Sequence, residues 1–127
     1  MTEQQNDLTT ANLDDQVRSS DLFVTVMRKQ KAIQAILGNS ARLDQPEYLR
    51  EQALALIVEV AEALQEKSWK SWKKNHKESQ EKFREELVDV QLFLCNLILV
   101  AGIEAGDFMQ LCLDKQAVTI KRQLENY

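Results

Sequence analysis

Apolar residues recur at helical spacing along most of the chain after residue 20. The first such segment follows Ser20, a predicted N-cap, and stops at Gly38, a predicted C′ residue. A second helix is predicted from Pro46 to about Lys67, because proline suits the first helical turn, where its missing N–H has no intrahelical partner. The positions that its period turns inward are Leu49, Ala53, Leu56, Ile57, Val60, Ala61 and Leu64.

Two further helices are predicted in the second half of the chain. One begins near Glu78 and ends at Gly102, and the other runs from about Glu104 to Gln123. No segment alternates with a period of two, and a content of Gly 3 and Pro 1 is too low for a turn-rich β fold. We therefore predict an all-α four-helix bundle protomer. It should form a dimer or higher oligomer, because the third helix has more apolar surface than its neighbours cover.

The composition indicates a single domain preceded by a tail. Residues 1–19 lack an apolar period and predict a flexible N-terminal tail, whereas residues 20–127 predict one all-α domain. The polar start predicts no signal peptide, and the longest apolar run, Leu92 to Ala101, is too short to span a bilayer. Cys95 and Cys112 lie in apolar runs and predict reduced thiols, so a cytoplasmic protein is expected. The net charge of -4 disfavours a dedicated nucleic-acid binder.

Two pairs of carboxylates lie in otherwise apolar sequence. Each pair is spaced i, i+3, which puts both groups on one helix face; the pairs are Glu59 with Glu62 and Glu86 with Asp89. Four carboxylates facing one another across a bundle would repel unless a cation lay between them, and Mg²⁺ suits such oxygen ligands. The alternative is a pair of solvated helix edges. A di-iron centre needs Glu-x-x-His on two helices, and the chain has only His76.

A basic and aromatic connector separates the two carboxylate pairs. It holds five lysines and the two tryptophans, including Trp69, Trp72 and Lys73. It is either a solvated loop or a rim that faces phosphates and offers an aromatic ring to a base. Lys115 and Arg122 belong to a second basic group near the end of the chain. Cations beside carboxylates suit a polyphosphate substrate.

Asn96 interrupts the apolar run seven residues after Asp89, nearly in line with it on the same helix face. A polar group at such a position is either hydrogen-bonded to a neighbouring helix or part of the site. The sequence leaves both interpretations open.

The chain has the motif Glu59-x-x-Glu62, then a gap of 23 residues, then Glu86-x-x-Asp89. This pattern resembles that of the all-α nucleoside triphosphate pyrophosphatase superfamily, which includes MazG-like proteins and dimeric all-helical dUTPases. The connector WKSWKK and the tail KQAVTIKRQLENY resemble the dUTPase branch, over roughly residues 22 to 127. In that branch Asn stands where this chain has Gln34 and Thr119, so the base and sugar preference is left open.

The resemblance implies a hydrolase of nucleotide metabolism that cleaves the α–β bond of a (d)NTP to a monophosphate and pyrophosphate. The four carboxylates would hold Mg²⁺, with Mn²⁺ as a substitute, and Glu59 or Glu62 would orient or deprotonate the attacking water. The candidate substrate-binding residues are Gln30, Gln34, Trp69, Trp72, Lys73, Asn96, Lys115 and Arg122. The resemblance also implies a homo-oligomer, as a dimer or a tetramer.

Three functions stay open at this point. The first is a pyrophosphohydrolase that prefers dUTP or another pyrimidine deoxynucleotide, and the second is a MazG-like house-cleaning enzyme for other or modified nucleotides. The third is a non-catalytic helical module that binds a partner protein. No membrane partner is expected, and nucleic acid is the least favoured ligand.

Overall fold

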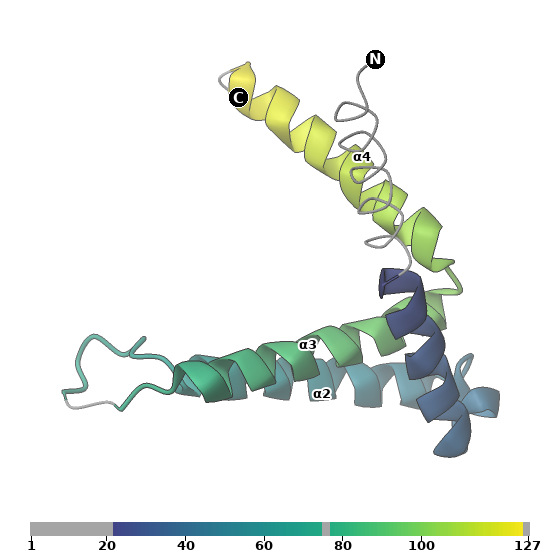
Figure 1. The fold of residues 1–127 in the computed structure, drawn as a ribbon, viewed down its shortest axis with the longest axis horizontal. Coiled ribbons are helices and arrows are strands. Elements are labelled where there is room, and N and C mark those ends of the chain that lie inside the picture. The colour runs from purple at the N-terminus through teal and green to yellow at the C-terminus, as the bar shows by residue number, and fades with distance from the viewer. Residues whose placement is uncertain (1–21, 75–76, 126–127) are drawn as a thin grey trace, which may run out of the picture. The chain divides into compact units, whose positions relative to one another are not determined.

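Every regular element in residues 22–74 and 77–125, the part of the chain that the computed structural model describes, is a helix (Figure 1). A first α-helix covers residues 22–36, followed by the 3-10 helix η1 (Ser40–Arg42), α2 (Pro46–Gln65), α3 (Gln80–Ala101) and α4 (Ala105–Leu124). The predicted all-α, four-helix class is confirmed. The predicted tail of residues 1–19 and the predicted cap at Ser20 lie outside the described residues.

Helix ends follow local chemistry at several boundaries. Gly38 has φ 79° and follows the first helix, where its N–H donates to the Ala35 carbonyl and the Asn39 N–H donates to the Gln34 carbonyl. These two bonds form a Schellman turn, as the glycine at C′ predicts. Gly102 ends α3 in the same left-handed region, with φ 69°. The Ser79 hydroxyl caps the start of α3 by accepting from the Lys82 N–H.

The chain divides into two compact units, which are described separately. One is Gln30–Gly102, and the described residues of the other are 22–29 and 103–125. In the first unit α2 and α3 lie side by side as an antiparallel hairpin, joined by the connector of residues 66–79 (Figure 1). In the second unit the rings of Phe23 and Phe108 stack, with centroids 6.3 Å apart.

The α2–α3 hairpin has a narrow buried stripe. Tyr48 and Cys95 are fully buried, but Ile57 and Val60, which the helical period turns inward, are 63% and 49% exposed. The expectation that they are buried is wrong for this protomer, because α3 covers one side of α2 only. Leu49, Ala61 and Leu64 of the same predicted inward set are exposed as well. Other exposed large apolar side chains of the hairpin are Leu54, Val58, Leu87 and Val88.

Cys95 and Cys112 are both free thiols, and Cys95 is buried. Among the described helices none is by itself long and apolar enough to cross a membrane, and α3 and α4 meet that test only when they are taken together across their break.

Candidate active site

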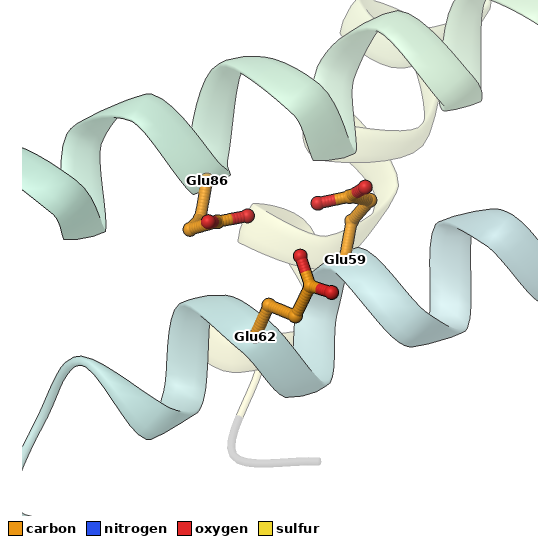
Figure 2. A group of neighbouring side chains, drawn as sticks. All are labelled: Glu59, Glu62 and Glu86. Atoms are coloured by element: carbon orange, nitrogen blue, oxygen red, sulfur yellow. The ribbon is translucent and has the colours of Figure 1, made fainter.

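Three carboxylates meet between α2 and α3. Figure 2 shows Glu59 and Glu62 from α2 and Glu86 from α3 pointing toward one another. One oxygen from each of these three lies within 4.8 Å of the others. The i, i+3 spacing places both α2 carboxylates on the face toward α3. Asp89, the fourth predicted ligand, is not part of this close group, although its charge reaches Glu59.

The neighbouring carboxylates raise the pKa of Glu59. A hydrogen bond with Glu86 is the largest of the effects that raise the pKa of Glu59 from its ordinary value of 4.5 to about 7. Burial raises this pKa further, as do the charges of Glu62 and Asp89. A proton must lie between two carboxyl groups for that bond to exist. In the structure the buried Oε2 atoms of Glu59 and Glu86 have no hydrogen-bond partner, so the bond between the two groups requires a proton on one of them.

These features fit a divalent cation. Two buried oxygens without partners and a third carboxylate beside them form an all-oxygen donor set, which hard cations such as Mg²⁺ prefer. A cation there would replace the shared proton and relieve the repulsion between the carboxylates.

Asp89, three residues after Glu86 on α3, lies in the wall of a pocket of about 320 Å³. Leu92 and Phe93 supply an apolar lining from α3. Five amide side chains line the same space; they are Gln30, Gln34, Asn39, Gln52 and Asn96. Apolar walls with a few fixed polar groups suit a flat ring that has hydrogen-bonding edges.

Hydrogen bonds fix these amides relative to one another. Gln30 Nε2 donates to Asn96 Oδ1 at 2.8 Å, and Asn96 Nδ2 donates to Gln52 Oε1 at 2.7 Å. Gln30, Gln34 and Asn96 are all buried. Asn96 therefore bonds to other helices, as the first of the two interpretations predicts, and it also lines the pocket. Its part in a substrate site stays a prediction.

Asn39, Tyr48 and Gln52 are not among the residues that the sequence predicts for the site. A signal was available for Gln52, which lies seven residues before Glu59 and so on the same face of α2. None was available for Tyr48, because its contact with Gln34 depends on how the first helix folds back onto α2.

The connector residues form a separate group. The rings of Trp69 and Trp72 meet edge to face with centroids 5.9 Å apart, and Trp72 is 73% exposed. A small recess there is lined by Gln65, Lys67, Trp69, Lys70 and Lys73. Within the described residues, the linings of this recess and of the amide pocket share no member.

Two further candidates lie in the other compact unit. Lys115 and Arg122 occupy exposed positions on α4, seven residues apart. Their side chains are thus about two helical turns apart on one face of that helix.

These features define an all-α protein with a carboxylate cluster suited to a divalent cation, next to a pocket suited to a flat polar ligand. The family model described as dUTPase matches residues 22–127, and the chain belongs to this family. The match confirms the family resemblance that the acidic motifs indicate, and it identifies the protein as a dUTPase-like nucleotide hydrolase. Neither a curated protein nor a solved structure gave a significant match.

Proposed function

We propose that the protein is a Mg²⁺-dependent nucleoside triphosphate pyrophosphohydrolase that prefers dUTP or another pyrimidine deoxynucleotide. It would cleave the α–β bond and release a monophosphate and pyrophosphate. The observation that carries the proposal is the adjacency of the acidic cluster and the amide pocket, which share Asp89 as a neighbour. A nucleotide has the matching form, with a flat hydrogen-bonding base at one end and a polyanion that binds cations at the other.

Glu59, Glu62 and Glu86 would hold the metal, with Asp89 completing the set from the pocket wall. When bound, Mg²⁺ supplies charge neutralisation to the phosphates and acidity to a coordinated water. Glu62 is exposed, whereas Glu59 and Glu86 are partly buried. A carboxylate open to solvent can accept a proton from an attacking water, so Glu62 is the favoured base, and Glu59 is the other candidate.

Cationic and aromatic residues would contact the rest of the substrate. Lys73 of the connector would neutralise phosphate charge, and the sequence predicts the same role for Lys115 and Arg122. The exposed Trp72 ring, or that of Trp69, would pack on the substrate. The proposal includes a cytoplasmic setting, where nucleoside triphosphates and Mg²⁺ are both present.

The proposal also includes a homo-oligomer, as a dimer or a tetramer. The exposed apolar side chains of the hairpin support it, because a soluble monomer seldom leaves so many neighbouring large side chains uncovered. Leu54, Ile57 and Val58 are three successive examples on α2, each more than half exposed. Sedimentation equilibrium of the wild-type protein measures the assembly directly.

The test is product analysis with Mg²⁺ and a panel of dUTP, dCTP, dTTP and the four ribonucleotides. Phosphorus NMR distinguishes pyrophosphate from orthophosphate, and so distinguishes cleavage of the α–β bond from cleavage of the β–γ bond. We expect pyrophosphate with the pyrimidine deoxynucleotides and its loss on addition of EDTA. Mn²⁺ should restore turnover after Mg²⁺ is removed.

Matched variants keep this test independent of contaminating phosphatases. Glu62→Gln should abolish turnover, whereas Glu85→Gln, which removes the same charge from an exposed position on α3, should not. A pure wild-type preparation that hydrolyses no member of the panel contradicts the proposal, and so does equal loss in both variants.

A further inference from the structure

Two series of hydrogen-bonded side chains end in the amide pocket. They differ in whether the order of donors and acceptors along the series is fixed. In the chain Gln30–Asn96–Gln52 every member is an amide, which carries a donor at one end and an acceptor at the other. Turning all three amides over would exchange donors and acceptors and leave the same bonds satisfied. This chain therefore does not by itself decide which group the pocket offers to a ligand.

In the second chain the order of donors and acceptors is fixed, because the chain begins at a guanidinium, which has no acceptor. Arg42 can only donate, and its Nη2 lies 2.9 Å from both carboxylate oxygens of Glu51. Its Nη1 donates to Asn39 Oδ1 at 3.1 Å. Asn39 must therefore turn its carbonyl toward Arg42 and its amino group the other way. Reversing Asn39 would place two donors face to face and leave both without an acceptor.

The orientation of the Asn39 amide in turn fixes the orientation of the Gln34 amide. Asn39 Nδ2 donates to Gln34 Oε1 at 2.9 Å, and the Tyr48 hydroxyl donates to the same oxygen at 2.8 Å. Burial raises the pKa of Tyr48, so its hydroxyl keeps its proton. Both bonds engage the Gln34 carbonyl oxygen. The amide NH₂ is then the group that Gln34 offers in the pocket that it lines.

Local structure holds this second chain in place. The Schellman turn at Gly38 brings Asn39 back over Gln34, and η1 places Arg42 one turn later, where its N–H donates to the Asn39 carbonyl. The Arg42 guanidinium also lies over the Tyr48 ring, 5.6 Å from its centroid. Tyr48 is fully buried and Gln34 is 5% exposed. The donor end of Gln34 is thus set by rigid neighbours and not by the ligand.

The position of Gln34 indicates which part of a base it meets. Its partner Tyr48 lies eleven residues before Glu59 on α2, about 16 Å along the helix from the acidic cluster. The sugar and phosphates leave a pyrimidine from N1 toward that cluster. The C4 substituent lies across the ring from N1, and so it faces the Gln34 end of the pocket.

We propose that Arg42 and Asn39 are positioning residues that force Gln34 to present an amide NH₂ to the C4 substituent of a pyrimidine. The pocket then accepts the C4 carbonyl of uracil or thymine and disfavours the C4 amino group of cytosine. This inference rests on the proposed function and deepens it, because it assigns base discrimination to residues outside the predicted site.

Substitutions at Asn39 and Arg42 can reverse the orientation of the Gln34 amide or leave it undetermined. In Asn39→Asp the carboxylate can only accept, so Gln34 must turn its NH₂ toward residue 39 and its carbonyl toward the pocket. In Arg42→Gln the chain loses the group that can only donate, so the Asn39 amide is no longer held in one orientation. Arg42→Lys keeps a group that can only donate, and serves as the conservative variant that should rescue discrimination. Tyr48→Phe removes one bond to Gln34 without changing the direction, and is the matched control.

The measurement is equilibrium binding of dUMP and dCMP by calorimetry in the presence of Mg²⁺, which needs no turnover. We expect the ratio of the two dissociation constants to move toward dCMP by on the order of tenfold in Asn39→Asp, and by less in Arg42→Gln. Arg42→Lys and Tyr48→Phe should keep the wild-type ratio. A purely structural role would change stability, or weaken both nucleotides alike, and would not move this ratio.

The outcomes separate the two proposals. Equal weakening of both nucleotides in Asn39→Asp, or an unchanged ratio, overturns the inference about Arg42 and Asn39, as does wild-type protein that binds neither nucleotide. Selective binding of dUMP by a wild-type protein that hydrolyses no triphosphate overturns the proposed function alone. Thermal melting of each variant identifies one that fails to fold, in which case Gln34→Glu, which places an acceptor directly in the pocket, gives the same test.

Discussion

Replacing Glu86 by glutamine should change how the stability of the metal-free protein depends on pH. In the folded wild-type protein the pKa of Glu59 is raised to about 7, and the largest cause is the hydrogen bond that the protonated Glu59 carboxyl donates to Glu86. In the unfolded chain this carboxyl has an ordinary pKa near 4.5. The folded state therefore binds the proton more tightly. The stabilisation is fully present below pH 4.5 and is lost as the pH rises through about 7.

The size of the effect follows from the same two pKa values. An interval from 4.5 to about 7 corresponds to at most about 3.4 kcal/mol, at roughly 1.36 kcal/mol per pH unit. Glu59 is only partly buried and Glu62 is exposed, so solvent screens the cluster. We therefore expect the wild-type protein to lose about 1–2 kcal/mol of unfolding free energy from this source between pH 5 and pH 8.

In Glu86→Gln the side-chain amide can donate to the ionised Glu59 carboxylate, which lowers the pKa of Glu59 and flattens the pH dependence. The assay is urea unfolding in EDTA at pH 5 and pH 8, followed by circular dichroism. Glu85→Gln, with the same net charge and an exposed position on α3, is the control and should keep the wild-type slope. If the two variants show the same loss between pH 5 and pH 8, the assignment of the raised pKa to Glu86 is wrong.

Three further predictions follow from the site and the turn beside it. Asp89→Asn should lower turnover by at least about a hundredfold at an unchanged melting temperature, and wild-type kcat in this variant would remove Asp89 from the proposed ligand set. Trp72→Ala should raise the KM for the triphosphate by on the order of tenfold with little change in kcat, and Trp72→Phe should restore it; an unchanged KM would exclude stacking on the substrate. Gly38→Ala should lower the unfolding free energy by about 1–2 kcal/mol, because φ is 79° while open space surrounds the added Cβ. A neutral result in chemical denaturation would show that this turn relaxes.

The helices and the pairing of Glu59 with Glu62 could be predicted because both depend on short-range spacing. Period 3.6 locates α2 and α3, and a separation of three residues puts Glu59 and Glu62 on one face whatever the tertiary structure. Periodicity does not say how many neighbours a helix has, so the exposure of Ile57 was not predictable. It also cannot anticipate side chains that meet through a turn, and Tyr48 bonds to Gln34 across fourteen residues of sequence.

Along α2 the residue of the amide pocket comes before the carboxylates of the acidic cluster. Gln52, in the pocket wall, precedes Glu59 by two turns, or about 10 Å, and the basic connector starts just after the helix ends at Gln65. On the proposed function, a base held by the amides would send its phosphates across the carboxylates toward the lysines of the connector. Polar amides, acidic groups and cations then follow one another along the hairpin in the order in which a nucleotide presents base, metal-bound phosphates and terminal charge. Since a single helix fixes this order, substrate orientation would be determined within the α2–α3 hairpin itself.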